Sequence, residues 1–255
     1  MIRDALRDKE YFDKWIDFTQ IKSIERNKKQ IFSLERDEGK AGCAYDLVMN
    51  ATQLCILRYS RGDELYDIQS SVQQAAEMLK IKSSILTSVE LKQSVREMYE
   101  RLDLGTFYEN LTILAFMVSL HAKNEAYLFV LNLIGHAGED SLLDHIAVAL
   151  GDTARQIARQ SKYPKVYDPL VEVITSPEDK RPAKLKKYIE GWYKRMKPIY
   201  WHDNHEGGEG AYFGYWCFEA ALAVMLFNID DASFCDNPYY PVDLVHYFKG
   251  SKRSQ

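Results

Sequence analysis

The chain has 255 residues, of which 46% are hydrophobic and 27% are charged. This composition is typical of a folded globular protein with one large domain or two modest ones, and it excludes a disordered or fibrous chain. The formal net charge of −4 excludes a strongly basic nucleic-acid-binding domain. Only 7 prolines and 13 glycines are present, which leaves room for long helices because these residues break them.

Two segments bear on the cellular location. Residues 1–8 carry acids and lack the apolar stretch of a secretory signal, and the most apolar segment, 111–120, is about half the length of a membrane span. We therefore expect a cytoplasmic protein without membrane contact. The four cysteines form no CxxC pair, and in a reducing compartment we expect them to be free thiols.

The N-terminal half shows helical periodicity. Apolar residues within 11–16 and 24–34 predict two opening helices, and those within 41–59 predict a helix of more than four turns. Arg61-Gly62-Asp63 supplies a stop and a new cap, and the period resumes over 65–79, so we predict an antiparallel helix pair. A further helix over 95–102 ends at Gly105, and Thr106 is the expected cap of an apolar helix that continues to His121.

The C-terminal half continues this pattern. Residues 127–134 are apolar on nearly every side, which predicts a helix that is buried all round. Asp140 or Ser141 is the expected cap of a helix that ends at Gly151, and Pro182 restarts a helix whose apolar face continues to Met196. The last long helix is predicted from about Ala211 to Phe227, after a glycine-rich loop over 207–210.

The predicted fold is all-α, because we find neither alternating strands nor a fixed repeat period. We expect a multi-helix bundle of roughly ten helices, with N-terminal helical hairpins packed on a C-terminal helical half. The expected domains are an N-terminal helical domain over 1–122 and a C-terminal helical domain over 123–250. Residues 251–255 are expected to form a disordered tail.

Charge is distributed unevenly along the sequence. From Pro198 to Phe248 there are eight acids and no Lys or Arg, and from Leu102 to Ala154 there are seven acids and a single base. Residues 180–197, by contrast, hold eight bases. An acidic surface repels DNA and attracts a basic partner.

The loop from Trp201 to Glu209 gathers two imidazoles and three carboxylates, which are groups that can ligate a divalent metal. It lacks the HExxH spacing or any other ordered set of ligands. Two interpretations are open: a solvated polar loop that presents acids to a basic protein, or a metal-dependent enzyme that uses His202, Asp203, His205 and Glu206. We favour the first and predict neither a resident metal nor a cofactor.

Glu219 is the only charged residue between Ala211 and Ile229. A catalytic interpretation makes it a carboxylate with a raised pKa, whereas a structural one ties it to a cation or to a tyrosine hydroxyl. We favour the structural interpretation, because no second carboxylate or nucleophile is identifiable beside it. GxSxG, P-loop and GxGxxG motifs are also absent from the sequence, so we predict no catalytic residue.

A resemblance to a known family adds to these inferences. It is carried by Ala211-Tyr212-Phe213-Gly214-Tyr215-Trp216-Cys217-Phe218-Glu219-Ala220-Ala221, Ile229-Asp230-Asp231 and Tyr239-Tyr240-Pro241-Val242-Asp243-Leu244-Val245-His246-Tyr247. These stretches closely resemble the C-terminal signature of the PoNi immunity family. Upstream, Trp192-Tyr193-Lys194, Tyr200-Trp201-His202-Asp203 and Leu57-Arg58-Tyr59-Ser60-Arg61-Gly62-Asp63 are similar to other parts of that family.

The resemblance covers roughly residues 5 to 248 and implies a helical protein that protects a bacterium from a polymorphic PoNe-type DNase toxin. Such toxins are often delivered by a type VI secretion system in bacterial competition. The resemblance also implies that the signature residues determine the fold: Gly214 for close helix packing, Glu219 as a buried tie, and Asp243 with Tyr240-Pro241 as a capped start to the final helix. Tyr215 and Trp216 belong to the same structural signature.

The expected partner is therefore the DNase toxin domain, with no direct contact to nucleic acid, and the chain is expected to be a monomer or a homodimer. A DNase must offer a basic groove to phosphates, and an inhibitor can compete for it with carboxylates and aromatic rings. Our hypothesis for the toxin-binding residues is Glu139, Asp140, Asp144, Asp203, Glu206, Glu209, Tyr212, Tyr239 and Tyr240. A helical adaptor for a non-toxin partner is a further alternative.

Overall fold

The structure is a computed structural model that describes residues 2–252. Helices dominate, and these residues include no β-strand, so the predicted all-α multi-helix fold is confirmed. Within the same range, none of the helices is both long enough and apolar enough to cross a membrane. The tail expected over 251–255 lies, from residue 253 onward, outside the described residues.

The chain divides into two compact units that are not continuous in sequence. Unit 1 contains residues 1–109 and 203–214, and unit 2 contains residues 110–202 and 215–255. The first division falls inside α6 (Leu104–Ser119), between Glu109 and Asn110. Unit 1 holds 22 acidic and 17 basic residues, whereas unit 2 holds 15 acidic and 16 basic residues, so the net negative charge of the chain resides in unit 1.

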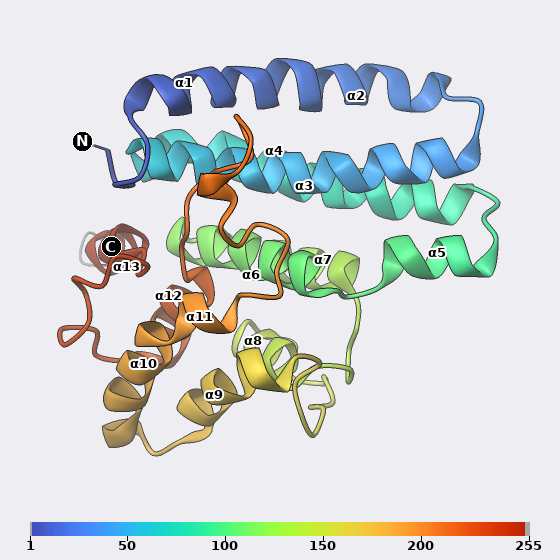
Figure 1. Cartoon of the computed structure of the whole chain (residues 1–255). Coiled ribbons are helices and arrows are strands. Elements are labelled where there is room, and N and C mark those ends of the chain that lie inside the picture. Colours follow the sequence, from blue (N-terminus) through green and yellow to red (C-terminus); the bar gives the residue numbers. More distant parts are fainter. Residues whose placement is uncertain (1, 253–255) are drawn as a thin grey trace. The chain divides into compact units, whose positions relative to one another are not determined.

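Unit 1 begins with a nearly unbroken helical run that packs on a helical hairpin (Figure 1). The run consists of α1 (Lys9–Asp17), the π-helix η1 (Phe18–Glu25), α2 (Arg26–Gln30) and the 3-10 turn η2 (Ile31–Ser33). The two opening helices predicted from the sequence therefore follow one another without a loop. Their buried residues, which include Phe12, Ile16 and Ile24, form the inner side of the run.

The hairpin of unit 1 pairs α3 (Asp37–Arg61) with α4 (Leu65–Ser88), as the sequence predicts. The turn depends on Gly62, which has a φ of 98° and lies in the left-handed region that glycine tolerates. The Gly62 N–H donates to the Tyr59 carbonyl at 3.0 Å, and the Asp63 N–H donates to the Arg58 carbonyl at 3.1 Å. Both bonds satisfy carbonyls that the end of a helix leaves open.

The start of α6 differs from the prediction. After α5 (Gln93–Glu100), Asp103 accepts a hydrogen bond from the Thr106 N–H at 2.9 Å, so the cap is Asp103. Gly105 and Thr106, which were expected to end one helix and cap the next, lie in the first turn of α6.

Unit 2 is built around α12 (Phe218–Phe227), a helix that is buried on every side from Phe218 to Met225. It packs against α8 (Ser141–Ala149), α9 (Pro164–Thr175) and α13 (Val242–Lys252). The unit also contains the part of α6 from Asn110 onward, α7 (Asn124–Ile134), η3 (Glu178–Lys180), α10 (Arg181–Glu190) and α11 (Trp192–Arg195). Pro182 lies in the first turn of α10, as predicted. Helix α9, which contains Pro169 in its interior, was not predicted from the sequence.

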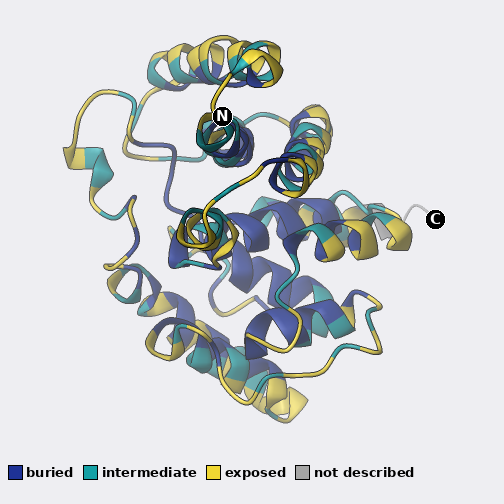
Figure 2. Cartoon of the chain, turned by 90° about the vertical axis from the view of Figure 1, so that its right-hand side faces the viewer, coloured by how far each residue is buried: buried dark blue, intermediate teal, exposed yellow. Residues whose placement is uncertain are grey.

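Two predictions for the C-terminal half are wrong. The last long helix starts at Phe218 rather than Ala211, and Gly214, with a φ of 115°, lies in the non-helical stretch before it. Gly214 therefore provides a backbone conformation, not close packing between helices. The second error concerns α7: its Leu128 and Phe129 side chains are 42% and 47% exposed, so this helix is not buried all round. Figure 2 shows the general pattern, with exposed residues along one side of many helices and buried residues along the other.

Candidate functional site

The polar loop singled out from the sequence belongs to unit 1, and we define the acidic loop as residues 203–210. It begins at Asp203, whose φ of 60° is left-handed, and continues through the 3-10 turn η4 (Asn204–Glu206). The Asn204 side-chain amide donates to the Ala211 carbonyl and closes the loop across its base. This internal bond gives an irregular segment a defined conformation.

The N-terminal segment of unit 1 holds the acidic loop and the residues that follow it. The Arg7 guanidinium donates to the His205 carbonyl at 2.5 Å, and the Tyr11 hydroxyl donates to the Tyr212 carbonyl at 2.8 Å. The Tyr212 hydroxyl donates in turn to the Asp4 carboxylate. Residues about 200 positions apart in the sequence are thereby fixed against each other.

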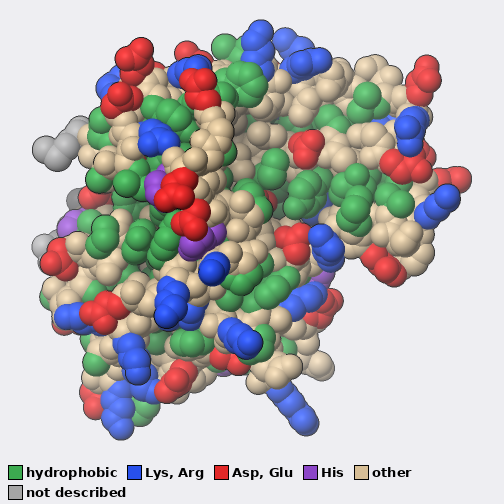
Figure 3. Space-filling view, viewed as in Figure 1, with side chains coloured by type: hydrophobic (Ala, Val, Ile, Leu, Met, Phe, Trp, Pro, Cys, Tyr) green, Lys and Arg blue, Asp and Glu red, His purple; other side chains and the backbone are tan. Residues whose placement is uncertain are grey.

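The carboxylates of the acidic loop face solvent. Asp203, Glu206 and Glu209 are all exposed, and the Glu206 and Glu209 side chains are 76% and 70% exposed. Glu209 pairs with Lys14 of α1. On the face drawn in Figure 3, acidic side chains gather over this segment. Three of the nine hypothesised toxin-binding residues are therefore on an accessible surface within one unit.

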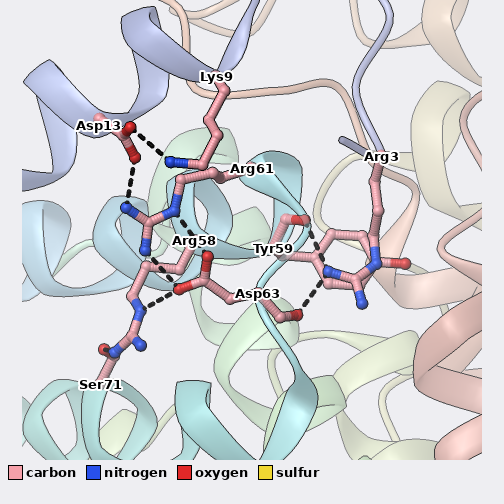
Figure 4. A network of polar contacts seen from close by, with 8 residues as sticks. All are labelled: Arg3, Lys9, Asp13, Arg58, Tyr59, Arg61, Asp63 and Ser71. Carbon is pink, nitrogen blue, oxygen red and sulfur yellow. Dashed lines mark hydrogen bonds and ion pairs between the residues drawn. The ribbon is translucent and has the colours of Figure 1, made fainter. Parts of the chain in front are cut away.

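A second polar network fixes the α3–α4 turn of unit 1 (Figure 4). The Asp63 carboxylate accepts from the Arg58 guanidinium at 2.8 Å and from that of Arg61 at 2.6 Å, and Arg61 also donates to Asp13 of α1 at 2.8 Å. Burial acts to raise the pKa of Asp63, but these hydrogen bonds outweigh it and hold the pKa below its ordinary value. The network ties α1 to the hairpin.

Three of the hypothesised toxin-binding acids, Glu139, Asp140 and Asp144, lie in unit 2, and only Glu139 is exposed. It pairs with His136 at 2.9 Å and with Lys162 at 3.3 Å. Hydrogen bonding to His136 lowers the pKa of the Glu139 carboxyl. Asp140 and Asp144 are fully buried, so neither offers its carboxylate to a partner from outside.

The two buried acids stabilise irregular backbone. Asp140 caps α8 by accepting from the Leu143 N–H at 2.9 Å, and it also accepts from the Lys162 N–H at 2.7 Å. Burial raises the pKa of this carboxyl. Asp144 accepts from the Ala158 N–H at 3.0 Å and pairs with Arg155 at 2.6 Å, and the Arg155 side chain is only 3% exposed.

The hypothesised aromatic residues are less accessible than expected. Tyr212 and Tyr240 are buried, and the Tyr240 hydroxyl donates to Asp231 at 3.0 Å. Tyr239 is half-buried and stacks in parallel on Tyr193, with ring centroids 5.2 Å apart. These rings pack within the protein because the burial of aromatic surface and a satisfied hydroxyl both stabilise the folded state.

The signature residues of the C-terminal half lie in or beside the core of unit 2. Tyr215 and Trp216 are buried, and the Tyr215 ring lies 5.0 Å from that of Tyr193. Pro241 directly precedes α13, and Asp243 lies in its first turn.

Glu219 is fully buried at the start of α12. Its carboxylate accepts hydrogen bonds from the Tyr188 hydroxyl at 3.0 Å and from the Trp192 indole N–H at 2.6 Å. Burial raises the pKa of this carboxyl, in spite of both bonds. The arrangement joins α10, α11 and α12 through one side chain and gives no solvent access to it.

The residues of the metal hypothesis, His202, Asp203, His205 and Glu206, are not arranged as a set of metal ligands. The His202 ring stacks on Tyr193 at 4.3 Å, and the His205 ring lies edge-on to Tyr212. Across residues 2–252, no three His, Cys, Asp or Glu side chains come together in a way that could hold a metal ion.

Comparisons with known proteins give a similar solved structure and a matching family. The chain is similar over nearly its whole length to "The Crystal Structure of Protein PA2201 from Pseudomonas aeruginosa", with a TM-score of 0.74 and 20% sequence identity over 98% of this chain and 92% of that one. No curated protein matches the chain. Residues 3–137 match the family model described as "PoNe immunity protein (PoNi), N-terminal", and residues 138–244 match the one described as "PoNe immunity proteins (PoNi), C-terminal". The chain therefore belongs to the PoNe immunity protein family.

Proposed function

We propose that this chain binds a PoNe-type DNase directly and thereby stops it from cutting DNA. The observation that carries the proposal is the pair of family matches, which together extend from residue 3 to residue 244. We place the encounter in the cytoplasm, where a DNase meets DNA, and propose a toxin of the polymorphic class that type VI secretion systems deliver. The chain acts by occupying the toxin and not by catalysis.

Electrostatics supports a direct contact with the DNA-binding groove of the toxin. That groove must be basic to hold phosphates. Unit 1 carries the excess of acid, with 22 acidic against 17 basic residues, and it exposes Glu206 and Glu209 on the acidic loop. Complementary charge of this kind steers association and suppresses wrong partners. Asp140, Asp144, Tyr212 and Tyr240 are not part of the proposed surface, because they are buried.

The test is calorimetric titration of the purified chain against the PoNe-type DNase domain encoded beside its gene, at low and high salt, with a DNA-cleavage assay in parallel. We expect tight binding that weakens as salt rises and that abolishes cleavage, because exposed charges are screened by salt. An absence of binding, with cleavage unaffected, would contradict the proposal for that toxin.

A genetic experiment separates an immunity protein from a helical adaptor with a non-toxin partner. Deletion of the gene should harm the bacterium only when the neighbouring toxin gene is intact. Harm that persists after the toxin gene is removed would favour the adaptor.

A further inference from the structure

The outer side of α1 and η1 in unit 1 exposes large apolar side chains that packing within the unit does not require. Phe18 is 49% exposed and Ile21 is 52% exposed. Trp15 lies beside them, with its ring 5.2 Å from that of Phe18 in an edge-to-face arrangement. We call Trp15, Phe18 and Ile21 the apolar ridge.

The π-helical turn explains how the ridge arises. The buried residues of α1 and η1 are Phe12, Ile16, Thr19 and Ile24. The last step, from Thr19 to Ile24, is five residues, whereas an α-helix returns to the same face after three or four. The wider π-helix lets Ile24 stay on the inner side, and Ile21 is left outside. Such π-helical turns are rare and frequently lie at functional sites.

The apolar ridge is continuous with the acidic loop. Glu209 pairs with Lys14, and the next residue, Gly210, packs its backbone so closely on Trp15 that a Cβ atom there would overlap the indole ring. The Trp15 ring then contacts Phe18. The loop and the ridge therefore form one surface within unit 1, which we call the docking face.

Charge along the docking face is graded. In its first part α1 exposes the acids Glu10 and Asp17, while the exposed Lys14 pairs with Glu209 of the acidic loop. Bases lie at its other end, where Lys22, Arg26 and Lys29 line a shallow groove of about 470 Å³ together with Ile21. A partner that matches this face presents cations on the side of the loop, as a DNA-binding groove does, and apolar surface beside them.

We infer that the docking face is the surface that contacts the nuclease domain of the toxin, with Phe18 and Ile21 as its apolar anchors. This inference rests on the proposed function. A few central apolar or aromatic residues carry most of the energy of a typical interface, and polar residues around them exclude water. The exposed carboxylates of the acidic loop fit that surrounding role.

The experiment compares two variants of the full chain by titration against the same DNase domain. The double variant Phe18→Ser/Ile21→Ser should lose roughly 100-fold in affinity, as expected when two interface anchors are removed. The matched control is Phe129→Ser, because Phe129 is a 47% exposed aromatic on α7 of unit 2, whereas the docking face belongs to unit 1. Its affinity should stay within about threefold of the unmodified chain, as is usual for contacts outside such anchors.

A second measurement does not depend on the folding of the variants. Hydrogen–deuterium exchange of the unmodified chain, free and with the DNase domain, should show slower exchange over 10–25 and 203–210 in the complex and no change over α7. Protection elsewhere, without protection of these two segments, would overturn the inference. So would full affinity of the double variant.

The outcomes distinguish this inference from the proposed function. If the unmodified chain fails to bind the DNase domain, both fail together. If it binds and the double variant binds equally well, only the docking face is wrong. If light scattering shows a dimer of the chain that the double variant dissociates while toxin binding is unchanged, the face serves self-association and the inference is overturned.

Discussion

Two irregular segments of the molecule, one in each unit, use their acids in opposite ways. The acidic loop of unit 1, residues 203–210, is held by the bond from Arg7 to the His205 carbonyl and by the bond from the Asn204 amide to the Ala211 carbonyl, and its carboxylates are exposed. The segment between α8 and α9 of unit 2, residues 150–163, is held by two carboxylates that point inward, Asp140 and Asp144. The same residue type serves as surface in one case and as an internal anchor in the other.

The donors available nearby account for the difference. Backbone N–H groups of an irregular segment have no ladder or helix partner, and a buried acid can satisfy several of them at once. Asp144 does so for Gly138 and Ala158. In the acidic loop, the side chains of Arg7 and Tyr11 supply donors to backbone carbonyls of the 203–214 segment. The Glu206 and Glu209 side chains remain largely exposed and are accessible to a partner.

The inward anchor gives the largest expected effect. Asp144→Ala should destabilise the chain by about 3–5 kcal/mol, because the buried Arg155 would keep only the longer pair to Asp152, at 3.6 Å, and two backbone N–H groups would lose their acceptor. Urea unfolding measures the change. Glu139→Ala is the control from the same region, since its side chain is 51% exposed and its ion pairs are worth about 1 kcal/mol or less. A loss below about 1 kcal/mol for Asp144→Ala would show that the segment does not depend on its anchor.

The outward loop can be disturbed through its glycines. Gly210 has a φ of 90° and no room for a Cβ atom beside Trp15, so Gly210→Ala should cost about 1–3 kcal/mol and weaken toxin binding by moving the loop. Gly208→Ala is the matched control, because nothing lies within 4 Å of its Cβ position and its φ is not left-handed. Urea unfolding and titration against the DNase domain should leave that variant nearly unchanged. Equal behaviour of the two variants would contradict the packing of Gly210 on Trp15.

The comparison also shows what the sequence could predict. Helical periodicity located most helices, and Arg61-Gly62-Asp63 marked a turn, because both signals are local. The number and positions of the acids in the sequence could not show that Asp144 is buried and that Glu206 is exposed. Whether a carboxylate faces inward depends on donors such as Arg155 and the Ala158 N–H, whose positions the fold decides.

Two further features, the non-helical segment 211–217 and the apolar ridge, could not be predicted from the sequence. Residues 211–217 are mostly apolar and aromatic, and such a run does not distinguish a buried helix from a buried extended segment. The glycine at position 214, which has a left-handed φ in the structure, was the only residue in this run that indicated a non-helical segment. The apolar ridge was hidden because Trp15 fits the helical period of a core residue, and only the five-residue step from Thr19 to Ile24 indicates a π-helical turn.

Glu219 is another acid that points inward, and the groups that donate hydrogen bonds to it are neutral. Its partners are the neutral Tyr188 hydroxyl, Trp192 indole and Cys217 thiol, and burial raises the pKa of its carboxyl above the ordinary value of 4.5. The folded chain therefore binds this proton more tightly than the unfolded chain does. The stability that this provides is present at low pH and is lost as pH rises from about 4.5 through the raised pKa.

Glu219→Gln should remove this contribution, because the amide does not titrate. The free energy of unfolding of the unmodified chain, minus that of the variant, should fall as pH rises above about 4.5, with a slope of at most about 1.4 kcal/mol per pH unit for one proton. Urea unfolding at a series of pH values measures it. Burial also raises the pKa of Asp140, but that group is present in both proteins and cancels in the difference. A difference that does not vary with pH would mean that Glu219 titrates alike in the folded and unfolded chains. Its neutral donors would then compensate its burial as fully as Arg155 and the backbone compensate that of Asp144.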